Sequence, residues 1–248
     1  MRSVAVALGV LEAVSERQPV GVSELARALD LPKTTTQRVL ATLAELGWVR
    51  VTDDAPTRWL ITSKAGAIGA RLQPDQELRA AVMPAMRELA ATTGETIHFS
   101  VPDERYVVLI DKVEGANPVR TTVTIGSRAP AHATSSGQAI LAALPDPVCR
   151  KLLSLQPLEA LTPDTIVDAE QLMTELATVR ERGYALVVRA RHNDVAATGA
   201  AVLNSVGSPV AALSISVPAH RFPETLWVEY GRLVSAAAAS CSAHSTQR

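Results

Sequence analysis

Apolar residues near the start of the chain recur with a helical period. Positions three and four apart predict a helix over 3–15 and two short helices within 22–46. A proline excludes the preceding residue from the helical region, so the turn between the short helices is expected at Pro32. We expect Ser23 to cap the first short helix and Gly47 to end the second. This layout is typical of a helix-turn-helix, whose second helix presents its first residues to a DNA major groove.

The pattern then changes to alternation. Residues 48–51 alternate, residues 58–61 return as a second strand, and a polar turn at 53–56 separates them. This predicts a two-stranded hairpin. A hairpin directly after the second helix makes the wing of a winged helix. The alternative is an amphipathic helical pair inside an unrelated core, and the wing favours DNA binding over that alternative.

The rest of the chain predicts a connecting segment and a second domain. A short helix is expected over 64–72, and a longer one over 78–92 that is kinked or restarted at Pro84. Alternation predicts about six strands, and helical spacing predicts helices on the faces of their sheet. The expected strands are 96–101, 106–110, 119–125, 184–189, 199–203 and 210–217, with helices within 126–144, 164–182 and 224–240.

Length and composition support two globular domains. The chain has 248 residues, of which 47% are hydrophobic and 20% charged. We predict a DNA-binding domain over 1–72, a linker helix over 73–92 and an effector-binding domain over 93–248. The fold class is therefore α+β. Aromatic residues make up only 3%, which argues against stacking on single-stranded nucleic acid.

Charge and cysteines narrow the function further. The net charge is −1, so DNA affinity has to depend on where the cations lie. Cys149 and Cys241 are far apart and fit thiols in a reducing cytoplasm. No run is long enough to span a membrane, and Glu12 interrupts the first apolar run, which disfavours a signal peptide. We expect a cytoplasmic, nucleoid-associated protein with no membrane partner, no cofactor and no metal.

Three stretches resemble the IclR family of bacterial transcriptional regulators. Residues 126–142, GSRAPAHATSSGQAILA, resemble the family's G-x-x-x-P-x-H-A-T-x-x-G-K-A-x-L-A motif, with Gln138 in place of the usual lysine. Residues 23–49 are similar to its DNA-binding helices, and 210–218 to its A-A-L-S-x-S-x-P strand. The resemblance implies a winged helix-turn-helix, a linker helix and a GAF-like effector-binding domain with an antiparallel sheet. It also implies homodimers, some paired into tetramers, on a double-stranded operator, and small organic effectors such as organic acids or aromatic metabolites. The family contains both repressors and activators.

The first turn of the second short helix supplies the expected DNA contacts. Its hydroxyls and amide are short enough to reach base edges or phosphates, and its cations can neutralise phosphates. Arg58 on the wing is expected at a phosphate or in the minor groove. For Arg38, an internal ion pair with Glu45 or Glu24 is an equal alternative. The predicted DNA-binding residues are Lys33, Thr34, Thr35, Thr36, Gln37, Arg38 and Arg58.

Two serine pairs are the first candidates for effector binding. The resemblance places Ser135 and Ser136 at a helix entry that faces the ligand, where backbone amides bind carboxylates. Ser214 and Ser216 alternate on one strand and therefore point to one face. Plain strand alternation explains that spacing equally well.

The chain departs from the family in the segment after Gly183-Tyr184. Apolar residues, Arg189 and Arg191 stand where the family has an acidic segment. We therefore expect a more apolar ligand or an anion held by arginine, and loss of the ligand is the third alternative. The predicted effector-binding residues are Ser135, Ser136, Ser214, Ser216 and Arg189.

Two other functions are alternatives to a regulator. An enzyme would use His132 with Ser135 or Asp111 in hydrolysis. The chain has no G-x-S-x-G, no phosphate loop and no H-E-x-x-H, and its histidines lack metal-ligand spacing, so we predict no enzyme activity. His132 is expected to be a structural hydrogen-bonding residue. The other rival is a sensor or dimerisation protein with degenerate DNA binding, which the intact turn at 33–38 disfavours.

Overall fold

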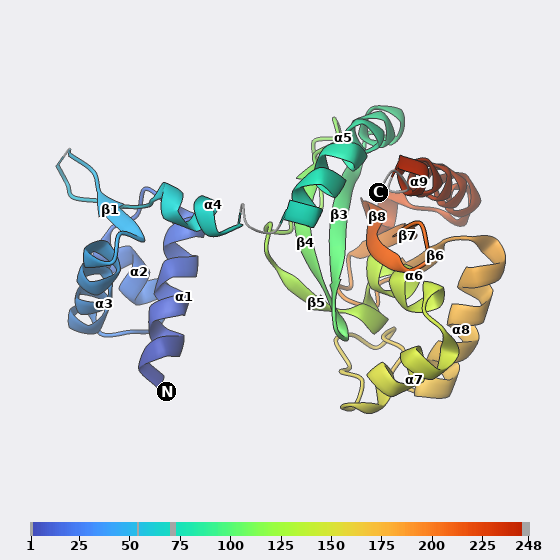
Figure 1. Ribbon diagram of the computed structural model, residues 1–248, viewed down its shortest axis with the longest axis horizontal. Helices are drawn as coiled ribbons and strands as arrows, with labels where there is room; N and C mark the ends of the chain where they lie inside the picture. The colour runs from blue at the N-terminus through green and yellow to red at the C-terminus, as the bar shows by residue number, and fades with distance from the viewer. Residues whose placement is uncertain (1, 54, 70–72, 245–248) are drawn as a thin grey trace. The chain divides into compact units, whose positions relative to one another are not determined.

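The computed structural model describes residues 2–53, 55–69 and 73–244. The chain forms two compact units, Met1–Gln76 and Glu77–Arg248, shown in Figure 1 and described separately here. Among the described residues, no helix is both long enough and apolar enough to cross a membrane.

The first unit is a winged helix-turn-helix, as predicted. Helices α1, α2 and α3 enclose a small core that includes Val10, Leu25 and Leu40, and Trp59 of the wing closes it. Strands β1 and β2 pair antiparallel, with Val49 opposite Ile61. The elements of this unit are α1 (Arg2–Arg17), α2 (Val22–Ala28), α3 (Lys33–Glu45), β1 (Val49–Val51), β2 (Trp59–Ile61) and α4 (Ser63–Gly69).

The start of α2 differs from the prediction. The N-cap is Gly21 rather than Ser23, because α2 begins one residue before Ser23. The carboxylate of Glu24 accepts a hydrogen bond from the Gly21 amide at 3.2 Å. A side chain from inside the first turn therefore satisfies the amide at the helix start.

The second unit is a six-stranded antiparallel sheet covered by helices on both faces. The strand order is β5-β4-β3-β8-β7-β6. Figure 1 shows α5 and α9 on one side of the sheet and α6, α7 and α8 on the other. The elements are α5 (Gln73–Thr93), β3 (Thr96–Asp103), β4 (Tyr106–Val113), β5 (Arg128–Pro130), α6 (Ser135–Ala143), α7 (Asp146–Ser154), α8 (Ala169–Arg182), β6 (Ala185–Val188), β7 (Val195–Leu203), β8 (Pro209–Pro218) and α9 (Glu224–His244).

Each face of this sheet has its own apolar core. Met86, Phe99 and Leu213 belong to the core under α5 and α9. Leu141 and Leu176 belong to the core under α6 and α8. This arrangement confirms the predicted α+β fold class.

Three details of the second unit differ from the prediction. The expected strand at 119–125 is a loop without regular secondary structure, and the short strand β5 takes its place in the sheet. Helix α7 follows Pro145 and was not predicted. Helix α5 begins at Gln73 and continues through Pro84, so no new helix starts at that proline.

Helix α6 packs so closely on its surroundings that two positions require glycine. A Cβ at Gly137 would lie 2.3 Å from the Cα and the carbonyl oxygen of Ala131. A Cβ at Gly199 on β7 would lie 2.9 Å from the carbonyl carbon of Ser135. The first turn of α6 therefore lies directly against the backbone of the preceding turn and of the sheet.

We expect Gly137→Ala to destabilise the second unit, because the new methyl group meets backbone atoms that have no room to move. Overpacking of this kind costs about 1–3 kcal/mol. Urea unfolding of the full chain, followed by tryptophan fluorescence and circular dichroism, measures the change.

The matched control is Gly66→Ala on α4, where a Cβ meets nothing within 4 Å. It should leave stability unchanged or raise it by up to about 1 kcal/mol through helix propensity. Equal unfolding midpoints for wild type and Gly137→Ala would show that this close approach is not a constraint.

Candidate functional sites

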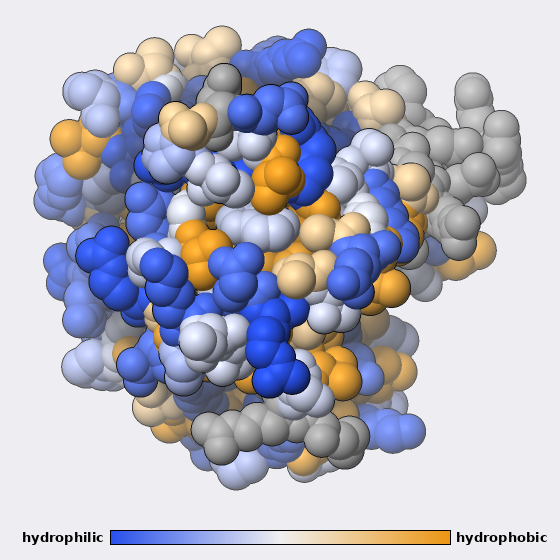
Figure 2. All heavy atoms as spheres, turned by 90° about the vertical axis from the view of Figure 1, so that its left-hand side faces the viewer, coloured by the Kyte–Doolittle hydropathy of each residue, from blue (hydrophilic) through white to orange (hydrophobic). Residues whose placement is uncertain are grey.

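The first turn of α3 presents polar side chains to solvent. Lys33, Thr34, Gln37 and Arg38 are exposed and Thr35 is half-buried. This side of the molecule is mostly hydrophilic, with apolar side chains in small separate groups (Figure 2). Arg38 makes no ion pair with any carboxylate in the described part of the chain. The arrangement leaves these groups available to a negatively charged partner.

Thr36 is the exception, and its prediction as a DNA contact is wrong. Its side chain is fully buried, and its hydroxyl donates a hydrogen bond to the carbonyl of Pro32 at 3.2 Å. The helical period explains the burial, because Thr36 lies one turn before Leu40 on the face that packs into the core.

Arg58 lies at the base of the wing. Its guanidinium pairs with Glu24 of α2 at 3.2 Å and donates to the carbonyl of Pro19 at 3.2 Å. The Gly21 amide and then Arg58 hold the pKa of Glu24 below its usual range. Glu24 is thus the partner of Arg58 and not of Arg38. Arg58 keeps 38% of its side chain exposed, so it still contributes a cation to this surface.

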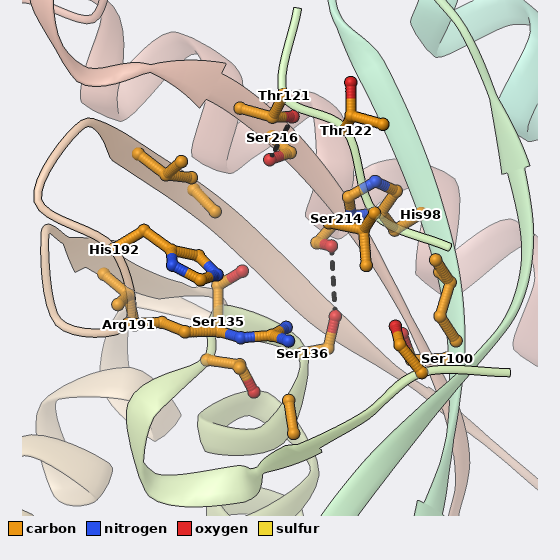
Figure 3. A pocket seen from close by; sticks show the side chains of 18 of the residues that line it. His98, Ser100, Thr121, Thr122, Ser135, Ser136, Arg191, His192, Ser214 and Ser216 are labelled. Atoms are coloured by element: carbon orange, nitrogen blue, oxygen red, sulfur yellow. Dashed lines mark hydrogen bonds between the residues drawn. The ribbon is translucent and has the colours of Figure 1, made fainter. Parts of the chain in front are cut away.

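A cavity of about 400 Å³ lies in the second unit beside the first turn of α6. Its volume falls in the range of small-molecule sites. Strands β3, β4, β7 and β8, the loop at 119–123 and the segment after β6 contribute to its wall. Figure 3 labels ten polar residues that line it: His98, Ser100, Thr121, Thr122, Ser135, Ser136, Arg191, His192, Ser214 and Ser216.

The structure brings all four predicted serines to this cavity. Ser136 donates a hydrogen bond to Ser214 at 3.0 Å, which joins α6 to β8. Ser216 accepts one at 2.8 Å from Thr121 in the loop. Thr134 caps α6 by accepting a hydrogen bond from the Gly137 amide at 3.1 Å. The N-terminus of α6 therefore opens onto the cavity.

The loop that lines the cavity is held by an ion pair whose carboxylate is buried. Glu95, at the start of β3, accepts two hydrogen bonds from Arg221 at 2.8 and 2.9 Å. It also accepts one from Asn117 at 2.9 Å, while Arg221 donates to the carbonyl of Val119 at 2.8 Å. The loop is thereby fixed to the end of β8 and to the start of β3.

The same loop also rests on the end of α5. A Cβ at Gly115 would lie 2.1 Å from the carbonyl oxygen of Gly94, the residue that follows α5. The amide of Asn117 donates to that carbonyl at 3.1 Å. Glycine at position 115 is thus required by a backbone-to-backbone contact.

The prediction of Arg189 as an effector-binding residue is wrong, and Arg191 lines the cavity instead. Arg189 follows β6 with φ of 59°, a left-handed turn, and its side chain is exposed. It is absent from the cavity wall, which includes Arg191. Burial lowers the pKa of Arg191. A turn of this kind has no signature in the sequence, so the choice between the two arginines required the structure.

His98 is a cavity residue that the sequence analysis missed. It is 8% exposed, and its Nε2 has no hydrogen-bond partner. Burial, then the charges of Lys112 and Arg191, lower its pKa from 6.5 to about 4. The available signal was the pair His98 and Ser100, two residues apart in an otherwise apolar strand.

The residues considered for hydrolysis do not form an active site. His132 is buried, and its Nε2 lies 3.0 Å from the carbonyl oxygen of Glu159. The carboxylate of Asp111 is paired with Arg79. Neither His132 nor Asp111 lines the cavity. Among the described residues, no group of three or more histidine, cysteine or acidic side chains is arranged to hold a metal ion.

Family comparisons match both units. The model of the IclR helix-turn-helix domain matches residues 3–53. The model of the bacterial transcriptional regulator IclR C-terminal domain matches residues 72–243. The chain belongs to the IclR family. It is a DNA-binding transcriptional regulator with an N-terminal helix-turn-helix and a C-terminal effector-binding domain.

Curated relatives and solved structures agree over nearly the whole chain. The transcriptional repressor IclR of Escherichia coli K12 is 32% identical, over 93% of this chain and 85% of the relative. The regulator KdgR of Dickeya chrysanthemi is 31% identical, over 97% and 78%. The crystal structure of Thermotoga maritima IclR superimposes with a TM-score of 0.80 at 27% identity, covering 99% of both chains. An IclR homolog of Microbacterium hydrocarbonoxydans, complexed with 4-hydroxybenzoate, has the same fold at 23% identity and a TM-score of 0.76, covering 98% of both.

The low pKa of His98 predicts a pH-dependent stability. Between pH 6.5 and about 4 the unfolded chain binds a proton at this residue and the folded chain does not. The stability that neutral His98 contributes is therefore present above pH 6.5 and lost as the pH falls toward 4. The loss approaches about 1.4 kcal/mol per pH unit within that window.

Urea unfolding at several pH values checks this prediction. His98→Leu should flatten the decline in stability relative to wild type, and His220→Leu, at an exposed histidine on the cavity rim, should not. Parallel curves for wild type and His98→Leu would contradict it.

Proposed function

We propose that the first turn of α3 and the wing bind a double-stranded operator. The observation that supports this is the exposed group Lys33, Thr34, Gln37 and Arg38 at the start of α3. In helix-turn-helix proteins these positions meet base edges and phosphates. Thr35 belongs to the same contact, and Arg58 supplies a phosphate contact from the base of the wing.

A small organic effector binds in the cavity and modulates operator binding. The proposed contacts are Ser135 and Ser136 at the N-terminus of α6 and Ser214 and Ser216 on β8, with Arg191 in place of Arg189. Their position around one cavity of about 400 Å³ supports this assignment. The N-terminus of a helix favours an anionic group, as does an arginine.

The domains proposed here have the bounds expected from the sequence. Residues 1–72 bind DNA, 73–92 act as the linker helix and 93–248 bind the effector. The protein acts as a homodimer, because helix-turn-helix dimers read operators of two half-sites. A tetramer made of two such dimers is the alternative. It works in the cytoplasm on the nucleoid and has no catalytic activity.

Selection of genomic DNA fragments by the purified full chain, followed by footprinting at two salt concentrations, tests the proposal. A recurrent site with two half-sites supports it and points to the regulated genes. Weak binding without any enriched sequence, both alone and with metabolite extracts added, would overturn it.

Arg38→Ala should lower operator affinity at least about tenfold and reduce the slope of log affinity against log salt by about one. The reason is the loss of one phosphate contact. The melting temperature should not change, because Arg38 makes no ion pair within the described chain. Fluorescence anisotropy at several salt concentrations measures both quantities.

Arg87→Ala is the control, since it removes an exposed charge of the same kind outside the helix-turn-helix unit. It should bind the operator like wild type. Equal losses in the two variants would mean that net charge, and not the position of Arg38, governs affinity.

A further inference from the structure

Several polar side chains of the cavity are paired with each other: Ser136 bonds to Ser214 and Ser216 to Thr121. Arg191 and the Nε2 of His98 have no partner among the described residues. The hydroxyl of Ser127 in the cavity wall is also buried without one. Because buried polar groups in folded proteins are nearly always paired, an unpaired group that faces a cavity indicates what the cavity binds.

Arg191 brings an uncompensated positive charge to the cavity. It makes no ion pair or hydrogen bond with any described residue, and burial is the cause of its lowered pKa. The other cavity arginine, Arg120, is paired with Glu114 at 3.3 Å. The one cavity carboxylate, Asp194, is exposed and is not paired with Arg191. An anion is the partner that a half-buried guanidinium lacks.

His98 reaches into the cavity from β3, a different wall from that of Arg191 (Figure 3). Its side chain is more than nine-tenths buried, and its Nε2 is unpartnered. The ring is neutral at physiological pH because burial lowers its pKa to about 4. A neutral imidazole has one donor and one acceptor nitrogen. A hydroxyl can either donate or accept, so it pairs with Nε2 in both tautomers.

The cavity wall also includes apolar side chains: Val107, Leu109, Ala129, Val187, Val195 and Ala197. We propose that the effector is a small organic anion that carries a hydroxyl group, with its charge held by Arg191 and its hydroxyl bonded to His98. The proposal rests on the effector role inferred above for this cavity. It makes Arg191 and His98 the residues that set effector specificity.

A panel of matched compounds tests the ligand class by calorimetry on the full chain. The hydroxy acids are glycolate, mandelate and 4-hydroxybenzoate. The same acids without the hydroxyl are acetate, phenylacetate and benzoate, and the uncharged forms are glycolamide, mandelamide and 4-hydroxybenzamide. At least one hydroxy acid should bind, more tightly than both of its matched compounds. Tighter binding of an amide or of a parent acid, or no binding by any hydroxy acid, would overturn the proposal.

Variants then assign the two roles. Arg191→Gln should lower the affinity for the hydroxy acid at least about tenfold. Arg189→Gln, two residues away and outside the cavity, should not. His98→Leu should reduce the preference for the hydroxy acid over its parent acid to about onefold, from about three- to tenfold in wild type. His98→Gln, which restores a polar group, should recover part of that preference.

Operator binding measured without any added compound tests the DNA-binding function separately from the proposed effector class. If the protein binds its operator and no hydroxy acid binds, the effector class proposed here is wrong and the regulator stands. If hydroxy acids bind and no operator is found, the cavity assignment stands and the DNA-binding function fails. Melting temperatures of all four variants show whether each one is folded.

Discussion

The buried carboxylate of Glu95 is the constraint on which the effector cavity depends. It is 3% exposed and joins three distant segments, because Arg221 and Asn117 both donate to it. Removing Arg221 or Asn117 leaves the buried carboxylate of Glu95 without one of its donors, which destabilises the contact between these segments. The cavity loop has no strand partner of its own, so this ion pair and the Thr121–Ser216 hydrogen bond hold it in place. The shape of the site thus depends on a polar interaction remote in sequence from most of its wall.

The sequence predicted what depends on local periodicity. The helix-turn-helix, the wing and five of the six strands follow from apolar spacing and turn residues, and the structure has them. The prediction of a strand over 119–125 is wrong because the alternation there has another cause. There Thr121 and Val123 face the cavity while Thr122 and Thr124 are more exposed, and Thr121 bonds to a side chain on β8 instead of to a neighbouring backbone. Alternate burial is common to strands and to loops that line a cavity.

The predicted site residues likewise divide into those that local periodicity places correctly and those whose position depends on the packed structure. Ser214 and Ser216 were placed correctly on one face because a strand has a period of two. Thr36 was misplaced because a run of three threonines covers most of a helical turn, and only the packed core decides which of them faces inward. The position of Arg189 depends on tertiary structure, and for His98 the spacing from Ser100 predicts a shared face but not its burial. A left-handed turn after β6 turns Arg189 away, and the burial of His98 arises from segments far along the chain.

The contact between Gly94 and Gly115 has a mechanical consequence. The loop at 119–123 contributes to the cavity wall, and its stem rests on the residue that follows the last turn of α5. No side chain separates the two backbones, so there is no soft layer to absorb a displacement. A compound that shifts the loop therefore presses directly on the end of α5. At this contact the cavity loop and the end of α5 therefore cannot be displaced independently of each other.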